Sequence, residues 1–123
     1  MWELTKSFRF EAAHSLTGTT LGPAGDEIHG HSFRAEVAVR GEPDPATGMV
    51  VDLGVLEANL ETVRKLLDHK MLNRVAGLDR PTLEHLARFI HDRLPKNLFV
   101  ARVTVYRDSS SEACSYVPLK ADI

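Results

Sequence analysis

Residues 31–40 read HSFRAEVAVR, and polar and apolar side chains alternate along them. The apolar members, at a spacing of two, are Phe33, Ala35, Val37 and Val39. Such alternation predicts a half-buried β-strand. Residues 3–13 repeat the spacing at Phe10 and Ala12, and the irregular residues 15–28 separate the two segments. The sequence therefore predicts two antiparallel strands joined by a long loop.

Two amphipathic helices are expected next in the chain. Apolar side chains recur at helical spacing over residues 53–67, and Asp52 is a suitable N-cap. A second helix is expected to begin at Pro81–Thr82 and to end before Pro95. Both helices have one apolar side, so both are expected to pack against a sheet.

The remaining strands complete the predicted fold. Valines recur within residues 100–105, which predicts a third strand, and residues 116–119 are a candidate fourth strand, reached through a hairpin at 108–113. The order of elements predicts an α+β fold, with a four-stranded antiparallel sheet and two helices packed on one face. Residues 1–123 are expected to form a single domain.

The composition narrows the class of protein. The 123 residues carry a formal net charge of −2 and are 43% hydrophobic, as in ordinary globular proteins. Neither a Lys/Arg cluster nor an apolar stretch long enough to span a membrane is present, so we expect no nucleic-acid and no membrane partner. The first residues lack a signal-peptide pattern, which favours the cytoplasm. Cys114 is the single cysteine, so an intramolecular disulfide and a cysteine-rich zinc site are excluded.

Three histidines form the most informative pattern. His29 and His31, separated by Gly30, point to the same face of a strand. His14 ends the preceding strand, so its imidazole can meet the other two if the strands are neighbours. Three imidazoles leave one tetrahedral position open, as in catalytic zinc sites, although iron, nickel or copper would also accept them. The alternative is a set of strand-end histidines that make ordinary hydrogen bonds.

Several motifs resemble the 6-pyruvoyltetrahydropterin synthase family. The segments FEAAH (residues 10–14) and HGHSF (residues 29–33) look like its metal-binding motifs. Residues 47–52, 67–73 and 81–84 are similar to three further motifs in the same order. The resemblance covers almost the whole chain and is strongest to the bacterial branch, the 6-carboxytetrahydropterin synthases of queuosine biosynthesis.

The resemblance implies a fold, an assembly and a cofactor. It implies the tunnelling fold, in which three subunits join their sheets into a barrel and two trimers stack into a hexamer with active sites between subunits. It implies Zn²⁺ at His14, His29 and His31, acting as a Lewis acid on the pterin side chain. Closing a barrel would also cover the sheet edges.

The resemblance also implies a proton-transfer pair. Asp68 and His69 match the pair that the family uses, with the carboxylate orienting the imidazole. The alternative is that both residues merely end the first helix, where a histidine interacts well with the helix dipole.

The chain departs from the family at the catalytic cysteine. The loop before His29 contains none, and Gly25 stands at the expected spacing. The loop does contain two carboxylates, Asp26 and Glu27, and Glu27 is the preferred candidate for the base. A solvated acidic turn is the competing interpretation. Cys114 is expected to be a small hydrophobic residue near a strand.

The substrate anchor is a second departure. The family grips the pterin with a glutamate after the third strand, and the candidates here are Asp108 and Glu112, because Arg107 cannot accept such bonds. Thr82, at the start of the second helix, is a further candidate for substrate contact. His85 and His91 are expected to be surface residues.

Three functions remain open from the sequence. The first is a lyase that makes 6-carboxytetrahydropterin from dihydroneopterin triphosphate. The second is a variant that cleaves the pterin side chain in the manner of an aldolase, with Glu27 as base. The third is a zinc-containing relative that binds a pterin or purine without turnover.

Overall fold

The two longest strands form one antiparallel pair. The computed structural model describes residues 1–20 and 22–119, and β1 (Trp2–His14) pairs with β2 (His29–Gly41) along their full lengths. In this register Phe10 lies opposite Phe33, and the two rings stack with centroids 5.0 Å apart. The alternation in residues 31–40 therefore predicted β2 correctly.

The sheet has five strands and is mixed, which corrects the expected four antiparallel strands. The strand order is β3-β1-β2-β4-β5, with β4 at Val100–Arg107 and β5 at Glu112–Tyr116. The additional strand β3 (Lys70–Met71) runs parallel to β1. It forms because His69 adopts a left-handed conformation (φ 59°) and donates its backbone N–H to the carbonyl oxygen of Glu11 (2.6 Å).

The last strand lies earlier than residues 116–119. A short 3-10 helix, η3 (Asp108–Ser110), and the left-handed Ser111 (φ 57°) reverse the chain, so β5 starts at Glu112. The turn takes fewer residues than the predicted loop at 108–113, so β5 begins to pair with β4 already at Glu112.

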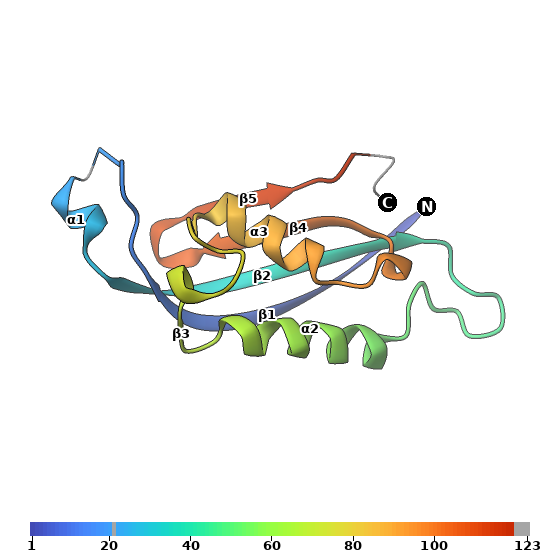
Figure 1. The fold of residues 1–123 in the computed structure, drawn as a ribbon. Coiled ribbons are helices and arrows are strands. Elements are labelled where there is room, and N and C mark those ends of the chain that lie inside the picture. The colour runs from blue at the N-terminus through green and yellow to red at the C-terminus, as the bar shows by residue number, and fades with distance from the viewer. Residues whose placement is uncertain (21, 120–123) are drawn as a thin grey trace.

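The helices begin where their caps predict. In α2 (Leu53–Leu67) the Asp52 carboxylate accepts from the backbone N–H of Gly54 (2.8 Å). In α3 (Leu83–Asp92) the Thr82 hydroxyl accepts from the N–H of His85 (3.2 Å). Besides η3, the described residues form three more short helices: α1 (Pro23–Asp26) within the long loop, η1 (Leu72–Arg74) and η2 (Lys96–Leu98). Figure 1 shows α2 and α3 running along the sheet, and α1 projecting at one end.

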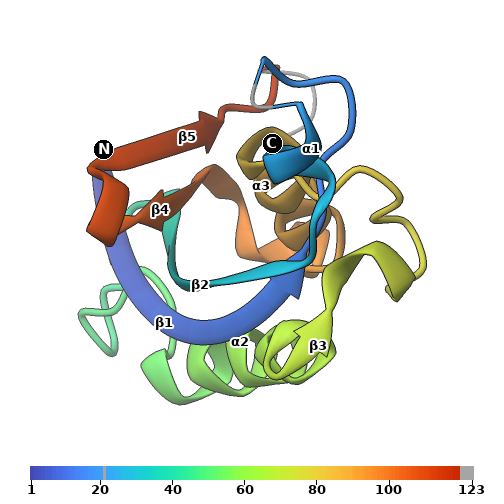
Figure 2. The same cartoon turned by 90° about the vertical axis from the view of Figure 1, so that its left-hand side faces the viewer.

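One core lies between the sheet and the two long helices. Buried side chains of α2 (Leu56, Leu60, Val63, Leu67) and α3 (Leu86, Ala87, Phe89, Ile90) join those of β1, β2 and β4 in one cluster. Both helices therefore cover the same sheet face, as expected, and burying each large apolar side chain contributes roughly 1.5–3 kcal/mol. The sheet that they cover is strongly curved (Figure 2).

The other face of the sheet carries charged side chains in pairs. Glu3 on β1 accepts from Arg40 on β2 (2.8 Å) and from Arg102 on β4 (3.0 Å).

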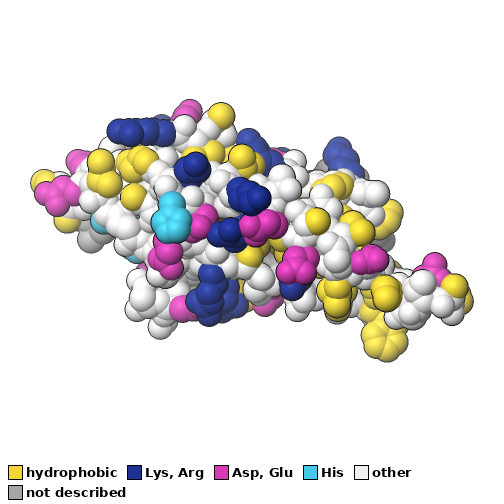
Figure 3. Space-filling view, turned by 90° about the horizontal axis from the view of Figure 1, so that it is seen from below, with side chains coloured by type: hydrophobic (Ala, Val, Ile, Leu, Met, Phe, Trp, Pro, Cys, Tyr) yellow, Lys and Arg dark blue, Asp and Glu magenta, His cyan; other side chains and the backbone are white. Residues whose placement is uncertain are grey.

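The α2 side of the molecule is also charged. There, Lys and Arg side chains are intermingled with Asp and Glu (Figure 3). Within residues 1–20 and 22–119, no helix has the length and apolar character needed to cross a membrane.

Candidate metal centre and its cavity

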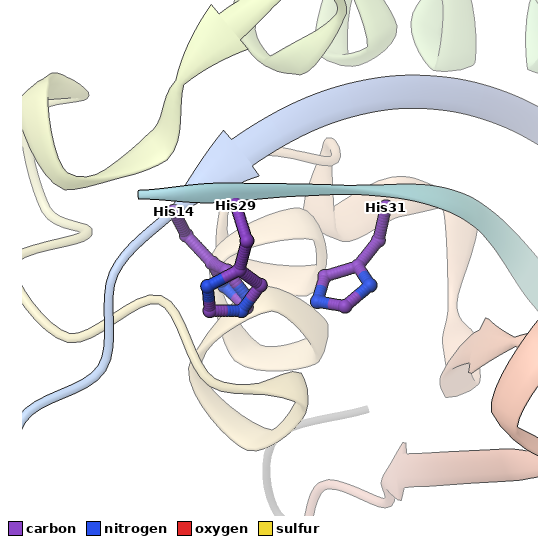
Figure 4. A group of neighbouring side chains, drawn as sticks. All are labelled: His14, His29 and His31. Carbon is purple, nitrogen blue, oxygen red and sulfur yellow. The ribbon is translucent and has the colours of Figure 1, made fainter. Parts of the chain in front are cut away.

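Three imidazoles meet where β1 ends and β2 begins. His14 lies directly opposite His29 in the strand register, and His31 lies opposite Ala12. The ring centroids are 4.6 to 4.9 Å apart, and one ring nitrogen from each histidine lies within 4.8 Å of the other two. All three side chains leave the same face of the two strands (Figure 4). The pairing that was expected from the sequence therefore brings the predicted ligands together.

Backbone carbonyls fix the tautomer of two of these rings. Nδ1 of His14 donates to the carbonyl oxygen of Pro81 (3.0 Å), and Nδ1 of His29 donates to that of Glu27 (2.9 Å). The lone pair of each ring is then on Nε2. The His14 side chain is 2% exposed, and its Nε2 has no hydrogen-bond partner among residues 1–20 and 22–119. A buried lone pair without a donor fits a metal ligand.

Burial favours the neutral form of His31 and of His14. Desolvation, together with the neighbouring charges of His14, Arg107 and His29, lowers the pKa of His31 to about 4. The pKa of His14 is also lowered, mainly by burial. Neutral imidazole is the form that binds a metal. The three residues therefore suit one divalent ion with an open coordination position.

A cavity of about 560 Å³ opens beside His14, and we call it the histidine cavity. Its polar lining comes from the start of α3, the end of β4 and the strand β5: Thr82, Glu84, Arg107, Glu112 and Cys114. Two of the residues proposed from sequence for substrate contact, Thr82 and Glu112, thus lie beside a metal ligand. The cavity is large enough for a bicyclic ligand.

Asp68 and His69 lie in a different place. His69 Nδ1 is 3.1 Å from the Asp68 carboxylate, and its side chain is 81% exposed. Asp68 also accepts from the N–H of Glu11 (2.9 Å) and from Arg64 (2.8 Å), and the Glu11 N–H is the largest cause of its lowered pKa. The predicted contact between Asp68 and His69 is therefore formed, and the pKa of the Asp68 carboxyl is lowered.

This pair borders a second cavity, which we call the edge cavity. It has a volume of about 530 Å³ and lies where β3 joins β1. Its lining includes Glu11, Gly30, His31, Ser32, His69 and Lys70. His31 borders this cavity, whereas His14 borders the histidine cavity. Within one chain, His69 and the histidine cavity are therefore separate.

Comparison with known proteins gives the family. Residues 3–118 match the family described as 6-pyruvoyl tetrahydropterin synthase. The chain belongs to the 6-pyruvoyl tetrahydropterin synthase family. Enzymes of this family act on pterins, and the resemblance stated from the motifs is confirmed.

Relatives within the family differ in activity. The chain is 42% identical over 99 residues to the 6-carboxy-5,6,7,8-tetrahydropterin synthase of Synechocystis, covering 76% of this chain and 75% of the relative. It is 39% identical over 89 residues to the dihydroneopterin monophosphate aldolase of Pyrococcus furiosus, covering 72% and 71%. The structure of the Caenorhabditis elegans 6-pyruvoyl tetrahydropterin synthase superposes with a TM-score of 0.80 at 25% identity, covering 96% of each chain.

The loop carboxylates of this family member face solvent. Glu27 and Asp26 are both exposed, and the contact that Glu27 makes toward the metal ligands uses its backbone carbonyl, which holds His29. The carboxylate of Glu27 is two residues from His29 and remains a candidate base.

Asp108 lies outside the histidine cavity. Its carboxylate pairs with Arg34 (3.0 Å) and lies 3.8 Å from Arg9. Asp108 is thus engaged by two arginines and is not part of the cavity lining, whereas Glu112 is. Of the two candidate anchors, Glu112 is thus the one beside the metal ligands.

Two cavity residues had no assigned role in the sequence analysis. Arg107 was set aside because it cannot accept hydrogen bonds, yet alternation along β4 places it on the buried face with Val103 and Val105. Cys114 is partly buried, and burial and the nearby Glu84 raise the pKa of its thiol. The strand periodicity was the signal that could have placed Arg107.

The remaining histidines behave differently from each other. His85 is exposed, as expected, with Nδ1 on the carbonyl oxygen of Arg80 (2.7 Å). The prediction that His91 is a surface residue was wrong: its side chain is 17% exposed, and its ring packs edge-on against Tyr116, with centroids 4.9 Å apart. Strand β5 passes over this side of α3 and covers the ring.

Proposed function

We propose that this protein is a zinc-dependent lyase of the 6-carboxytetrahydropterin synthase type, acting on dihydroneopterin triphosphate in queuosine biosynthesis. The observation that carries the proposal is the buried, unpartnered Nε2 of His14 within a group of three histidines beside a cavity. The Synechocystis relative, 42% identical, is a 6-carboxy-5,6,7,8-tetrahydropterin synthase.

The metal would be held by His14, His29 and His31. A bound Zn²⁺ supplies a Lewis acid that polarises an oxygen of the pterin side chain. The chain's own contribution is orientation, because the carbonyl oxygens of Pro81 and Glu27 hold two of the rings in the required tautomer.

Glu112 is the proposed anchor of the pterin. A pterin presents two N–H donors along its guanidine-like edge, and one carboxylate can accept both. Glu112 lines the histidine cavity and is held by Arg107. Thr82 supplies a hydroxyl on the neighbouring wall, so donor and acceptor groups flank the same space.

Asp68 and His69 are the proposed proton-transfer pair. The Asp68 carboxylate fixes the ring of His69 through Nδ1, which leaves Nε2 free to exchange a proton with the substrate. Since the pair borders the edge cavity, it would serve the metal site of a neighbouring copy of this chain. A hexamer of two stacked trimers, with sites between subunits, is the assembly that we propose.

Aldolase-type cleavage is the second candidate function. The Pyrococcus furiosus relative is a dihydroneopterin monophosphate aldolase, and this chain lacks the loop cysteine. In this variant Glu27 would act as the base, because it is tethered two residues from His29. The reaction would then break a carbon–carbon bond of the pterin side chain, at the same site.

Incubation of zinc-loaded protein with dihydroneopterin triphosphate and with the monophosphate separates these functions. Mass spectrometry should identify 6-carboxytetrahydropterin if the first proposal holds. A pterin shortened by retro-aldol cleavage would support the second instead. Tight pterin binding with neither product would leave a binding protein, and would refute both enzymatic proposals.

A further inference from the structure

Arg107 brings a permanent positive charge to the metal ligands. It ends β4, and its side chain, 18% exposed, enters the histidine cavity. One terminal nitrogen, Nη2, donates to the Glu112 carboxylate, and the other, Nη1, lies 3.4 Å from Nε2 of His31. The guanidinium therefore lies between the proposed pterin anchor and a proposed metal ligand.

The donors of Arg107 are only partly satisfied. A guanidinium has five N–H donors and cannot be neutralised near neutral pH. The Nε of Arg107 is buried and has no hydrogen-bond partner in residues 1–20 and 22–119. A metal ion at the three histidines would take the lone pair of His31, so Nη1 would also lose its acceptor. Arg107 lines the histidine cavity, so its terminal N–H groups can donate to a ligand bound there.

The surroundings of Arg107 favour an anionic ligand once a metal is bound. Two carboxylates, Glu84 and Glu112, line the same cavity, and Glu112 is already engaged by Arg107. A divalent ion and the guanidinium together exceed these two negative charges. The first turn of α3 also borders the cavity through Leu83 and Glu84, and a helix N-terminus adds positive potential.

We propose that Arg107 is a specificity-determining residue, which binds an oxyanion carried by the pterin side chain next to the metal ligands. The group is a phosphate or a carboxylate, since both accept bonds from a guanidinium. The inference rests on the proposed function, in that it assumes a pterin in the histidine cavity. It adds that a pterin with a neutral side chain binds poorly, because Arg107 is then left without its acceptor.

The test is a comparison of stable, fluorescent pterins by titration. Zinc-loaded protein is titrated with neopterin, neopterin monophosphate and 6-carboxypterin. Wild type should bind at least one anionic pterin on the order of tenfold or more tightly than neopterin, as expected for a charge-assisted hydrogen bond. In Arg107→Gln this ratio should fall to near one, while zinc content stays the same. Tighter binding of neopterin monophosphate would indicate a phosphate site, and tighter binding of 6-carboxypterin would indicate a carboxylate site.

Two further variants control for charge and folding. Arg107→Lys keeps the positive charge and should keep part of the preference for anionic pterins. A folded Arg107→Lys that binds all three pterins equally would contradict a role for the charge at this position. Arg102→Gln removes the same charge from the same strand but on the opposite face, where Arg102 pairs with Glu3. It should behave as wild type. An unchanged ratio in Arg107→Gln would overturn the proposal.

The titrations also distinguish a failure of the proposed function from a failure of the role proposed for Arg107. If neopterin and both anionic pterins fail to bind wild type, the pterin assignment fails. Inorganic phosphate then tests the anion site by itself, through a thermal shift of the zinc-loaded protein. A shift in wild type that is absent in Arg107→Gln supports an anion site, whereas equal shifts in both overturn it.

Discussion

The histidine cavity and the edge cavity differ in how much of a site one chain supplies. In the first, strand register brings His14 and His29 face to face, and burial lowers the pKa of His14 and of His31. In the second, His69 has a left-handed backbone conformation at the sheet edge, and its side chain is 81% exposed. The carboxylate of Asp68 orients its ring. The three candidate metal ligands thus come from one protomer, while the proposed proton-transfer pair is presented outward. The difference indicates that the two cavities have separate roles and can be disabled separately.

The largest expected effect is loss of the metal from the histidine cavity. The double variant His29→Ala/His31→Ala removes two of three imidazoles, so zinc content should fall from about one per chain to none. Elemental analysis of protein never exposed to chelators measures this. His85→Ala, an exposed histidine on α3, is the matched control and should keep its zinc. Full zinc occupancy in the double variant would refute the assignment.

Disabling the edge cavity should affect turnover and leave the metal in place. His69→Ala removes the proposed proton carrier, so kcat should fall about 10²- to 10⁴-fold, the usual contribution of general acid–base catalysis. Asp68→Asn should lower kcat by less, because it only removes the orienting partner. Steady-state kinetics and zinc content are measured together. Unchanged turnover in His69→Ala would refute the catalytic assignment and would indicate that Asp68 and His69 only end the helix α2.

The loop before His29 should give a smaller effect than His69. Glu27→Gln removes the proposed base and should lower kcat about 100-fold, at the low end for such groups, with zinc retained. Asp26→Asn changes the adjacent carboxylate and is the matched control. Loss of turnover in Cys114→Ala, with full activity in Glu27→Gln, would instead assign the role to the thiol that lines the histidine cavity.

The smallest expected effect is a pH dependence of stability in the metal-free protein. The pKa of His31 is about 4 in the folded chain, against an ordinary value of 6.5, and that of His14 is also lowered. Between these values the unfolded chain binds more protons, so stability is full above about pH 6.5 and falls as the pH is lowered toward 4. We expect a loss on the order of 1–3 kcal/mol.

Urea unfolding of zinc-free protein at several pH values measures this loss. His31→Gln should reduce the slope, because the neutral amide has no proton to gain. A wild-type stability that rises as the pH falls from 6.5 would contradict the burial of neutral histidines.

Strong side-chain periodicity made part of the fold predictable. Phe33, Val37 and the residues between them predict β2, and the caps at Asp52 and Thr82 predict where the helices begin. The clustering of the candidate metal ligands followed from the same alternation, because His29 and His31 share a face.

Elements without periodicity were not predictable. The strand β3 consists of two residues that pair through backbone bonds, so no side-chain pattern marks it. In β5 most side chains are exposed, and the apolar residues beyond it, Val117 to Leu119, suggested a later strand. Arg107 was set aside for a different reason: a guanidinium cannot accept the hydrogen bonds of a pterin. Its place on β4, on the same face as Val103 and Val105, nevertheless brings it to the cavity.

A complementation experiment tests most directly whether the two cavities combine across copies of the chain. The His14→Ala/His29→Ala variant removes two candidate metal ligands, neither of which lines the edge cavity. His69→Ala keeps the histidine cavity, so each homogeneous preparation should be inactive. Mixed assemblies, made by joint refolding, would pair an intact metal site with an intact His69 from another subunit. We expect about a quarter of wild-type activity from equal mixing of two-subunit sites. No recovered activity in mixed assemblies that form normally would contradict the shared site.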